Sequence, residues 1–188
     1  LSVTANSIQL NGASQLSSGT ASMRMAAHTN NTAIDVGTSS TAGSPLHISN
    51  ADLAKITSGG GLTIGDSSNG AVTIDGITDA NTGTLGTLTL VAMKQSTSVT
   101  FTGSASSFNK GITIQANAGV VLSQDVLTKA SPTVLFAGEG TVTVLSGKAI
   151  SSSGQELTLT ADDIDLQGDA SVSTGDAAAG RLRSVPSS

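Results

Sequence analysis

Short strands of one form recur along the whole chain, and this repetition limits the folds open to it more than any other feature of the sequence. Each strand reads apolar, any residue, apolar, and is flanked by Gly, Ser, Asn or Asp. Such alternation is typical of a strand with one buried side. The segments are LSV (1–3), IQL (8–10), MRM (23–25), IDV (34–36), LHI (46–48), LTI (62–64), VTI (72–74), LTL (88–90), VTF (99–101), ITI (112–114), VVL (120–122), VLF (134–136), VTV (142–144), LTL (157–159) and IDL (164–166).

The segments return at a nearly constant interval of 21 to 24 residues, which places them in series. The first series is Leu88, Ile112, Val134 and Leu157, the second is Val99, Val120, Val142 and Ile164, and a weaker third is Phe108, Val126, Ile150 and Val172. Three short strands in a coil of about 22 residues are what a triangular parallel β-helix requires, whereas an antiparallel sandwich would turn back every 8–12 residues or so. We therefore predict an all-β, right-handed parallel β-helix (a β-solenoid) of about seven to eight coils over residues 1–188.

Within each series we expect parallel strands paired in register, because each coil stacks on the one before it. The expected neighbours are Ile112, Val134 and Leu157 in the first series and Val120, Val142 and Ile164 in the second, with Ile114, Phe136 and Leu159 in a buried row. One coil departs from this pattern near residues 50–56. There Asn50 is a favourable N-cap and Asp52 falls in the first turn, which predicts a short helical turn in place of a strand.

The two ends of the sequence resemble each other. LSVTANSIQLNGASQLSSG (1–19) aligns without a gap with LTLTADDIDLQGDASVSTG (157–175), at an offset of 156 residues. This is either a longer repeat or the general likeness of any two coils. The strand edges at the ends of a solenoid need cover, and residues 176–188 read as an irregular polar tail. We expect a segment of a longer array, stacked head to tail on neighbouring coils of the same chain or of another subunit.

The composition excludes several classes of protein. Aromatic residues make up 2% of the chain, with no Trp and no Tyr, which suits a narrow core of Val, Ile, Leu and Ala. The net charge is −5 with only eight Lys and Arg, so we expect no nucleic-acid partner. No run of about 18 apolar residues occurs, so we expect no membrane insertion. The absence of Cys excludes disulfides and thiolate metal sites.

Two phrases give the chain a resemblance to a known family. LAKITSGGGLTIG (53–65) and GAVTIDG (70–76) resemble a phrase of filamentous-haemagglutinin-like repeat proteins, in which a short helical turn precedes two strands. LTLTADDIDLQG (157–168) is similar to their strand–turn–strand phrase. The likeness covers most of the chain, and its most specific part is 46–76. It implies a parallel β-helix shaft of a secreted or cell-surface protein, used for adhesion or as a structural fibre.

The densest acidic cluster consists of Asp162, Asp163, Asp165 and Asp169. Carboxylates on neighbouring turns can hold a calcium ion, and a pair of them can serve a glycoside hydrolase. Neither the calcium-binding nonapeptide nor an EF-hand loop occurs, and the chain has no array of aromatic sugar platforms. We expect a solvated acidic edge, with calcium binding as the alternative.

The two histidines, His28 and His47, have no Cys or acidic residue at ligand spacing beside them in the sequence. Neither lies in a recognisable nucleophile motif. We therefore expect both on the surface, and we predict no catalytic residue, no metal site and no cofactor.

Threonine predominates at the outward middle position of the strands, and we call this row the threonine ladder. It comprises Thr63, Thr89, Thr113 and Thr158 in the first series and Thr73, Thr100 and Thr143 in the second, with Leu135, Val121 and Asp165 as expected interruptions. A flat row of threonines is how some β-solenoids bind ice. Threonine is also a good strand former for any wet face, and both interpretations stay open.

Taken with the resemblance, these patterns favour a non-catalytic structural or adhesive module of an extracellular fibre, secreted or on the cell surface. The alternatives are an ice-binding or carbohydrate-binding β-solenoid and, less favoured, a polysaccharide-degrading enzyme. Expected partners are the neighbouring coils and surface glycans. Asn30, in the phrase Asn-Asn-Thr, is the one candidate acceptor for an N-linked glycan.

Overall fold

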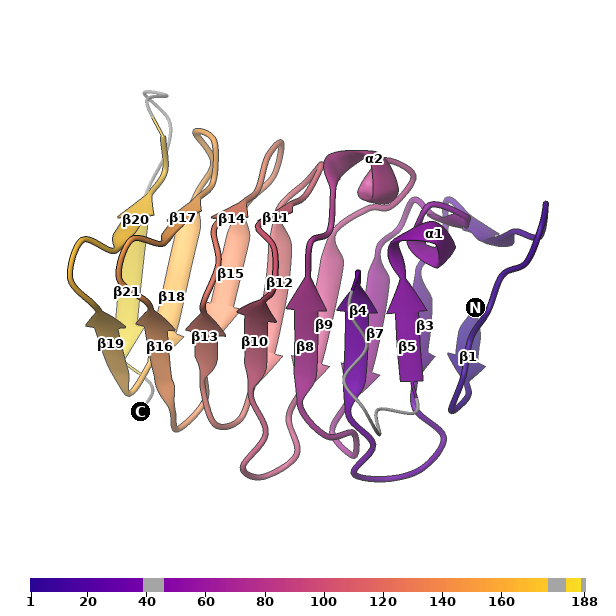
Figure 1. Cartoon of the computed structure of the whole chain (residues 1–188), viewed down its shortest axis with the longest axis horizontal. Helices are drawn as coiled ribbons and strands as arrows, with labels where there is room; N and C mark the ends of the chain where they lie inside the picture. Colours follow the sequence, from indigo (N-terminus) through magenta and orange to yellow (C-terminus); the bar gives the residue numbers. More distant parts are fainter. Residues whose placement is uncertain (39–45, 176–181, 187–188) are drawn as a thin grey trace.

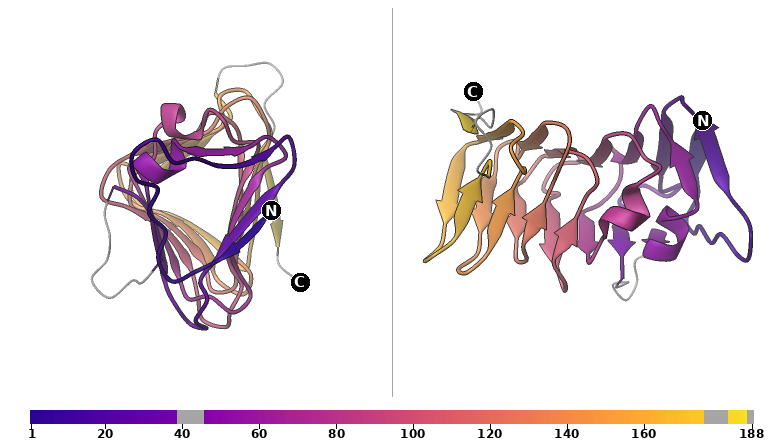
Figure 2. Two further views of the ribbon diagram at one scale, coloured as in Figure 1. Left: turned by 90° about the vertical axis from the view of Figure 1, so that its right-hand side faces the viewer. Right: turned by 90° about the horizontal axis from the view of Figure 1, so that it is seen from above.

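The computed structural model describes residues 1–38, 46–175 and 182–186 of the chain (Figure 1). The chain winds as a right-handed parallel β-solenoid of about seven turns, with about 24 residues in each turn. Seen along its axis, the solenoid has three faces around a common core (Figure 2). The predicted fold class is confirmed, and the turn is slightly longer than the 22 residues expected from the sequence.

The first face is an 8-stranded parallel sheet. Its order is β1 (Ser2–Thr4), β3 (Met23–Ala26), β7 (Leu62–Asp66), β9 (Leu88–Ala92), β12 (Ile112–Ala116), β15 (Thr133–Phe136), β18 (Leu157–Ala161) and β21 (Leu182–Pro186). The final strand lies within the stretch that we expected to be an irregular tail. Residues 176–181 and 187–188 of that stretch lie outside the described residues.

The second face is a 7-stranded parallel sheet. From the amino-terminal end its order is β5 (Leu46–Ser49), β4 (Ile34–Gly37), β8 (Val72–Asp75), β10 (Val99–Thr102), β13 (Val120–Leu122), β16 (Thr141–Val144) and β19 (Asp163–Leu166). The third face has shorter strands in two sheets. These are β2 (Leu16–Gly19) with β6 (Ile56–Ser58), and β11 (Ser106–Ser107), β14 (Val126–Leu127), β17 (Ala149–Ser151) and β20 (Ser171–Ser173).

The register of the second series is as predicted, because Val120 pairs with Val142 and Val142 with Ile164. The register of the first series is wrong by one residue at β15. There Val134 pairs with Thr113 and with Thr158, so Leu135 points into the core and is fully buried.

The buried row of the first face therefore passes through Ile114, Leu135 and Leu159, and Phe136 is turned outward and half-buried. The cause is Thr133, which occupies a buried position opposite Leu157 at the start of β15. Once Thr133 faces inward, the alternation of the strand places Val134 and Phe136 on the outside.

The core is one continuous column of apolar side chains along the solenoid axis. Most of its members are Ile, Leu and Val with no exposed surface, and the largest are Phe101 and Phe108, whose rings meet edge to face at 6.4 Å. Close stacking also demands glycine at Gly65, which has a φ of +93° and where a Cβ would lie 2.1 Å from the carbonyl oxygen of Val91. Narrow coils of small side chains thus fill the interior without a globular core.

Helix α1 (Asn50–Leu53) confirms the predicted helical turn but begins differently from expectation. Its N-cap is Ser49, whose hydroxyl accepts from the backbone N–H of Asp52 while the Asp52 carboxylate accepts from the backbone N–H of Ser49. This reciprocal capping box leaves Asn50 inside the helix, where its side-chain amide donates to Thr38 and to the carbonyl of Gly76. Helix α2 (Asp79–Thr82) takes the place of a strand on the third face, next to β11.

Strand β5 steps backward along the solenoid. It follows β4 in the chain, yet it pairs with the edge of β4 that faces the amino-terminal end, while β8 occupies the other edge. It thereby takes the place on the second face that the first coil would fill. The expected strand IQL at residues 8–10 does not form, and this segment passes outside β5 instead.

Candidate functional surfaces

The threonine ladder lies where the sequence predicted it, on the outside of two faces. On the first face the neighbours in register are Thr63, Thr89, Thr113, Val134 and Thr158, and on the second they are Thr73, Thr100, Val121, Thr143 and Asp165. All of these side chains are half-buried. Because Val134 replaces the expected Leu135, the row on the first face is β-branched at all five positions and is more regular than predicted.

A shallow apolar groove of about 380 Å³ crosses the first face beside this row. Met93, Val134 and Phe136 supply its apolar surface, with Thr113 and Gln115 at its polar side. Phe101 and Phe108 are buried, so Phe136 is the one aromatic ring of the chain that reaches the surface. A half-exposed ring beside an amide and a hydroxyl can stack on an apolar face of a ligand and hydrogen-bond to its edge.

The four aspartates of the acidic cluster lie in the last coil but do not converge. Asp162, Asp163 and Asp169 are exposed, and Asp165 is half-buried on the outer side of β19. Asp165 accepts from the Gln167 amide at 2.7 Å, and the Asp163 carboxylate accepts from the N–H of the next residue.

Asp169 points instead toward the preceding coil. It accepts from the Ser146 hydroxyl at 2.9 Å, and this hydrogen bond lowers the pKa of the Asp169 carboxyl. Within the described residues, no three His, Asp or Glu side chains gather closely enough to hold a metal ion.

The structure gives His47 an acidic neighbour that sequence reasoning missed. Asp35 on β4 pairs in register with His47 on β5, although twelve positions separate the two in the chain. Asp35 is buried, and the Nε2 atom of His47 lies 3.2 Å from the carbonyl oxygen of Gly37. Only the backward step of β5 brings the pair together, so spacing along the sequence carried no signal of it. His28 and Asn30 lie exposed on the turn after β3.

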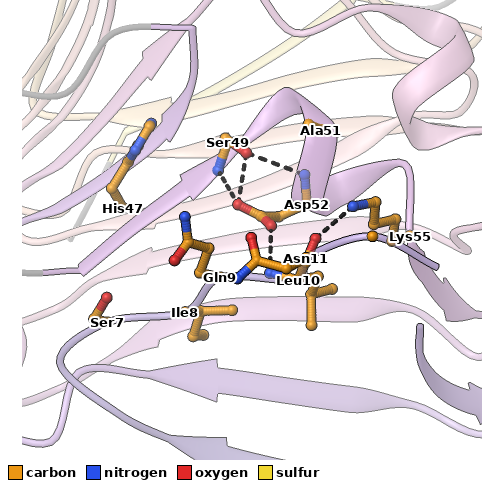
Figure 3. Close-up of a pocket in the computed structure, with 11 residues that line it drawn as sticks. Ser7, Ile8, Gln9, Leu10, Asn11, His47, Ser49, Ala51, Asp52 and Lys55 are labelled. Carbon is orange, nitrogen blue, oxygen red and sulfur yellow. Dashed lines mark hydrogen bonds between the residues drawn. The ribbon is translucent and has the colours of Figure 1, made fainter. Parts of the chain in front are cut away.

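A groove of about 470 Å³ lies at the amino-terminal end, and we call it the N-terminal groove. It separates residues 7–12 from β5 and α1 (Figure 3). Its walls are Ser7, Ile8, Gln9, Leu10, Asn11 and Gly12 on one side and His47, Ser49, Ala51, Asp52 and Lys55 on the other. β5 is the edge strand of its sheet, so this groove runs along a strand edge to which no other described strand is hydrogen-bonded.

Helix α1 holds residues 7–12 beside that edge at a single point. The Asp52 carboxylate accepts from the backbone N–H of Leu10 at 2.8 Å, and the Lys55 ammonium donates to the carbonyl of Leu10. Asp52 also accepts from the Ser49 hydroxyl at 2.5 Å, so one carboxylate serves both the helix cap and this clamp. The segment is therefore tethered near β5 without being part of the sheet.

The comparisons with known proteins add no name to this fold. No protein-family model, no curated protein and no solved structure matches the chain. The class defined by the fold is a parallel β-solenoid repeat protein of about seven turns. Neither helix among the described residues is long and apolar enough to cross a membrane.

Proposed function

We propose that the chain is a non-catalytic structural or adhesive module of an extracellular or cell-surface fibre, in which solenoids stack head to tail. The observation that carries the proposal is the distribution of incompletely buried core residues. Those at the amino-terminal end are Val3, Ile8, Leu10 and Leu16, and those at the carboxyl-terminal end are Ile164, Ala170 and Val172. Leu1 and Leu166, with 55% and 46% of their surfaces exposed, are the exposed large hydrophobics of the described residues, one at each end.

An apolar core that opens at both ends favours further stacking. Strand edges with unpaired N–H and C=O groups lie around each opening, and such edges readily add another strand. The two ends of a solenoid differ from each other, so their contact is heterologous and continues into a filament rather than closing. The resemblance of 46–76 to filamentous-haemagglutinin-like repeats supports an adhesive shaft outside the cell, where surface glycans would be the partners.

Electron microscopy and sedimentation of the purified chain test this proposal. We expect a concentration-dependent series of oligomers and straight filaments with the width of one solenoid. A chain that stays monomeric at high concentration would contradict it. Hydrolysis of a polysaccharide that is abolished by Asp163→Asn or Asp165→Asn would favour the enzyme instead.

The regular β-branched row on the first face supports a second candidate, a surface that binds ice or carbohydrate. Five β-branched side chains in register present alternating methyl groups and hydroxyls at the strand spacing of roughly 4.8 Å. Phe136 and Gln115 extend this surface toward a sugar ring. Thermal hysteresis that is lost in Thr89→Lys would favour ice, whereas glycan binding that is lost in Phe136→Ala would favour carbohydrate.

A further inference from the structure

The two ends of the solenoid are stepped. At the amino-terminal end, β1 stacks on β3 and β5 stacks on β4, so β1 and β5 form one layer. Residues 7–10 lie beyond β5 and therefore extend the second face by one layer more (Figure 1).

At the other end the step is reversed. β18 and β19 follow each other in one coil, and β21 stacks on β18 alone. Here it is the first face that extends one layer further. The protruding layer at each end thus corresponds to a missing layer at the other end, on both faces.

We propose that two copies of this chain meet in a lap joint, in which residues 7–10 of one copy form a strand between its own β5 and the β19 of the next. The proposal rests on the proposed head-to-tail stacking and specifies the contact. The first face would continue from β21 to β1, and the second from β19 through 7–10 to β5. Each copy would contribute eight layers to each face, which is an axial repeat of roughly 38 Å at the strand spacing.

The side chains of 7–10 suit this position. Ser-Ile-Gln-Leu at 7–10 has the same alternation as Asp-Ile-Asp-Leu at 163–166, where the segment does form a strand. In register, Ile8 would cover Ile164 and Leu10 would cover Leu166, the residue of β19 whose side chain is 46% exposed. Ser7 and Gln9 would then lie beside Asp163 and Asp165, where each can donate a hydrogen bond to a carboxylate.

Charge favours contact between unlike ends. Residues 1–26 contain no Asp or Glu, whereas residues 157–175 contain four Asp and no Lys or Arg. Two carboxyl-terminal ends would bring these aspartates together and repel each other. Two amino-terminal ends would place one protruding layer against another and leave both β1 edges unpaired. The second copy therefore fits in one polarity.

Strand addition also accounts for the N-terminal groove. The groove exists because 7–10 is held at Leu10 by Asp52 and Lys55 without hydrogen bonds to β5. If β19 of a second copy pairs with the outer edge of 7–10, the segment becomes an interior strand with backbone partners on both sides. This would align the segment with β5 and close the groove, so the joint includes a local ordering step.

Disulfide cross-linking tests the register, because the chain contains no Cys. We expect a mixture of the single variants Gln9→Cys and Asp165→Cys to form a covalent heterodimer on mild oxidation, since in-register neighbours on parallel strands fall within disulfide range. Either variant alone should give little dimer. A mixture of Gln9→Cys with Thr100→Cys, on the middle of the shaft, is the matched control. Efficient dimers of Asp165→Cys alone would overturn the proposed polarity.

A substitution in the apolar contact tests the role of 7–10. Ile8→Asp should weaken association at least about tenfold, because it removes apolar surface from the joint and adds a charge beside the aspartates. Gln95→Asp adds the same charge on an exposed turn in the middle of the shaft and should leave association unchanged. A monomeric wild-type chain would refute both head-to-tail stacking and the joint. Filaments that ignore Ile8→Asp, with no more Gln9–Asp165 cross-linking than in the control, would refute the joint alone.

Discussion

The side-chain oxygens of Thr128 and Thr133 lie 2.6 Å apart in the core, and neither residue has any exposed surface. Thr128 follows β14, and Thr133 opens β15 on the next face. Each hydroxyl satisfies the other, which removes the penalty of placing two polar groups among apolar side chains. This hydrogen bond allows Thr133 to face inward and so sets the register of β15.

We expect the two threonines to be strongly coupled in a double-mutant cycle. Thr128→Val or Thr133→Val alone should lower the free energy of unfolding by about 1–3 kcal/mol, because each leaves a buried hydroxyl without its partner. The double variant should be nearly as stable as the wild type, since both polar groups are then gone. Urea unfolding of the four proteins measures the coupling. Additive effects of the two substitutions would contradict it.

The inward position of Leu135 makes a second prediction. Leu135→Ala should lower the free energy of unfolding by about 2–5 kcal/mol, because it opens a cavity in the core. Phe136→Ala removes a larger side chain from the half-exposed outer face and should cost only about 1 kcal/mol. Urea unfolding of both variants decides between the two registers, since the order of the two losses would be reversed if Phe136 faced inward.

The register of these strands shows what the sequence could predict. Around Val120, Val142 and Ile164 a single apolar alternation is available, so the facing of each residue follows from the pattern. Thr-Val-Leu-Phe at 133–136 permits two alternations, and the apolar run alone favours the wrong one. The deciding factor is a hydrogen bond to Thr128, a residue of the preceding strand region, which local periodicity does not contain.

The candidate surfaces divide in the same way. The threonine ladder follows from period-two alternation and was predicted apart from position 134. The N-terminal groove and the Asp35–His47 pair both arise because β5 pairs with the far edge of β4. Leu-His-Ile at 46–48 has the same local pattern as every other strand, so its direction of stacking could not be predicted. The same step displaces 8–10, whose local pattern also predicts a strand.

Acid should weaken the solenoid through Asp66. Burial raises the pKa of this carboxyl, but hydrogen bonds from the backbone and hydroxyl of Ser68 and from the backbone of Asn69, with the charge of Arg24, outweigh it, so the pKa lies below its ordinary value of 3.8. A group with a depressed folded-state pKa stabilises the protein above its unfolded-state pKa, and this stabilisation is lost as the pH falls through the folded-state pKa.

The measurement is the difference in urea midpoint between the wild type and Asp66→Asn at neutral pH and at successively lower pH. We expect the wild type to be more stable at neutral pH, and the difference to shrink as the pH falls below about 3.8. A difference that does not vary with pH would show that the ionised carboxylate contributes nothing.

The double role of Asp52 yields the last prediction, which concerns dynamics. Its carboxylate accepts from the Leu10 N–H and from the Ser49 hydroxyl. Asp52→Ala should speed amide hydrogen exchange at Leu10, because the N–H loses its acceptor and the segment 7–12 loses a tether. Ser49→Ala is the matched control, since it removes the helix cap, at a cost of about 1 kcal/mol, but keeps the carboxylate beside Leu10. Equal acceleration at Leu10 in both variants would mean that α1 as a whole, and not the Asp52 carboxylate, holds the segment in place.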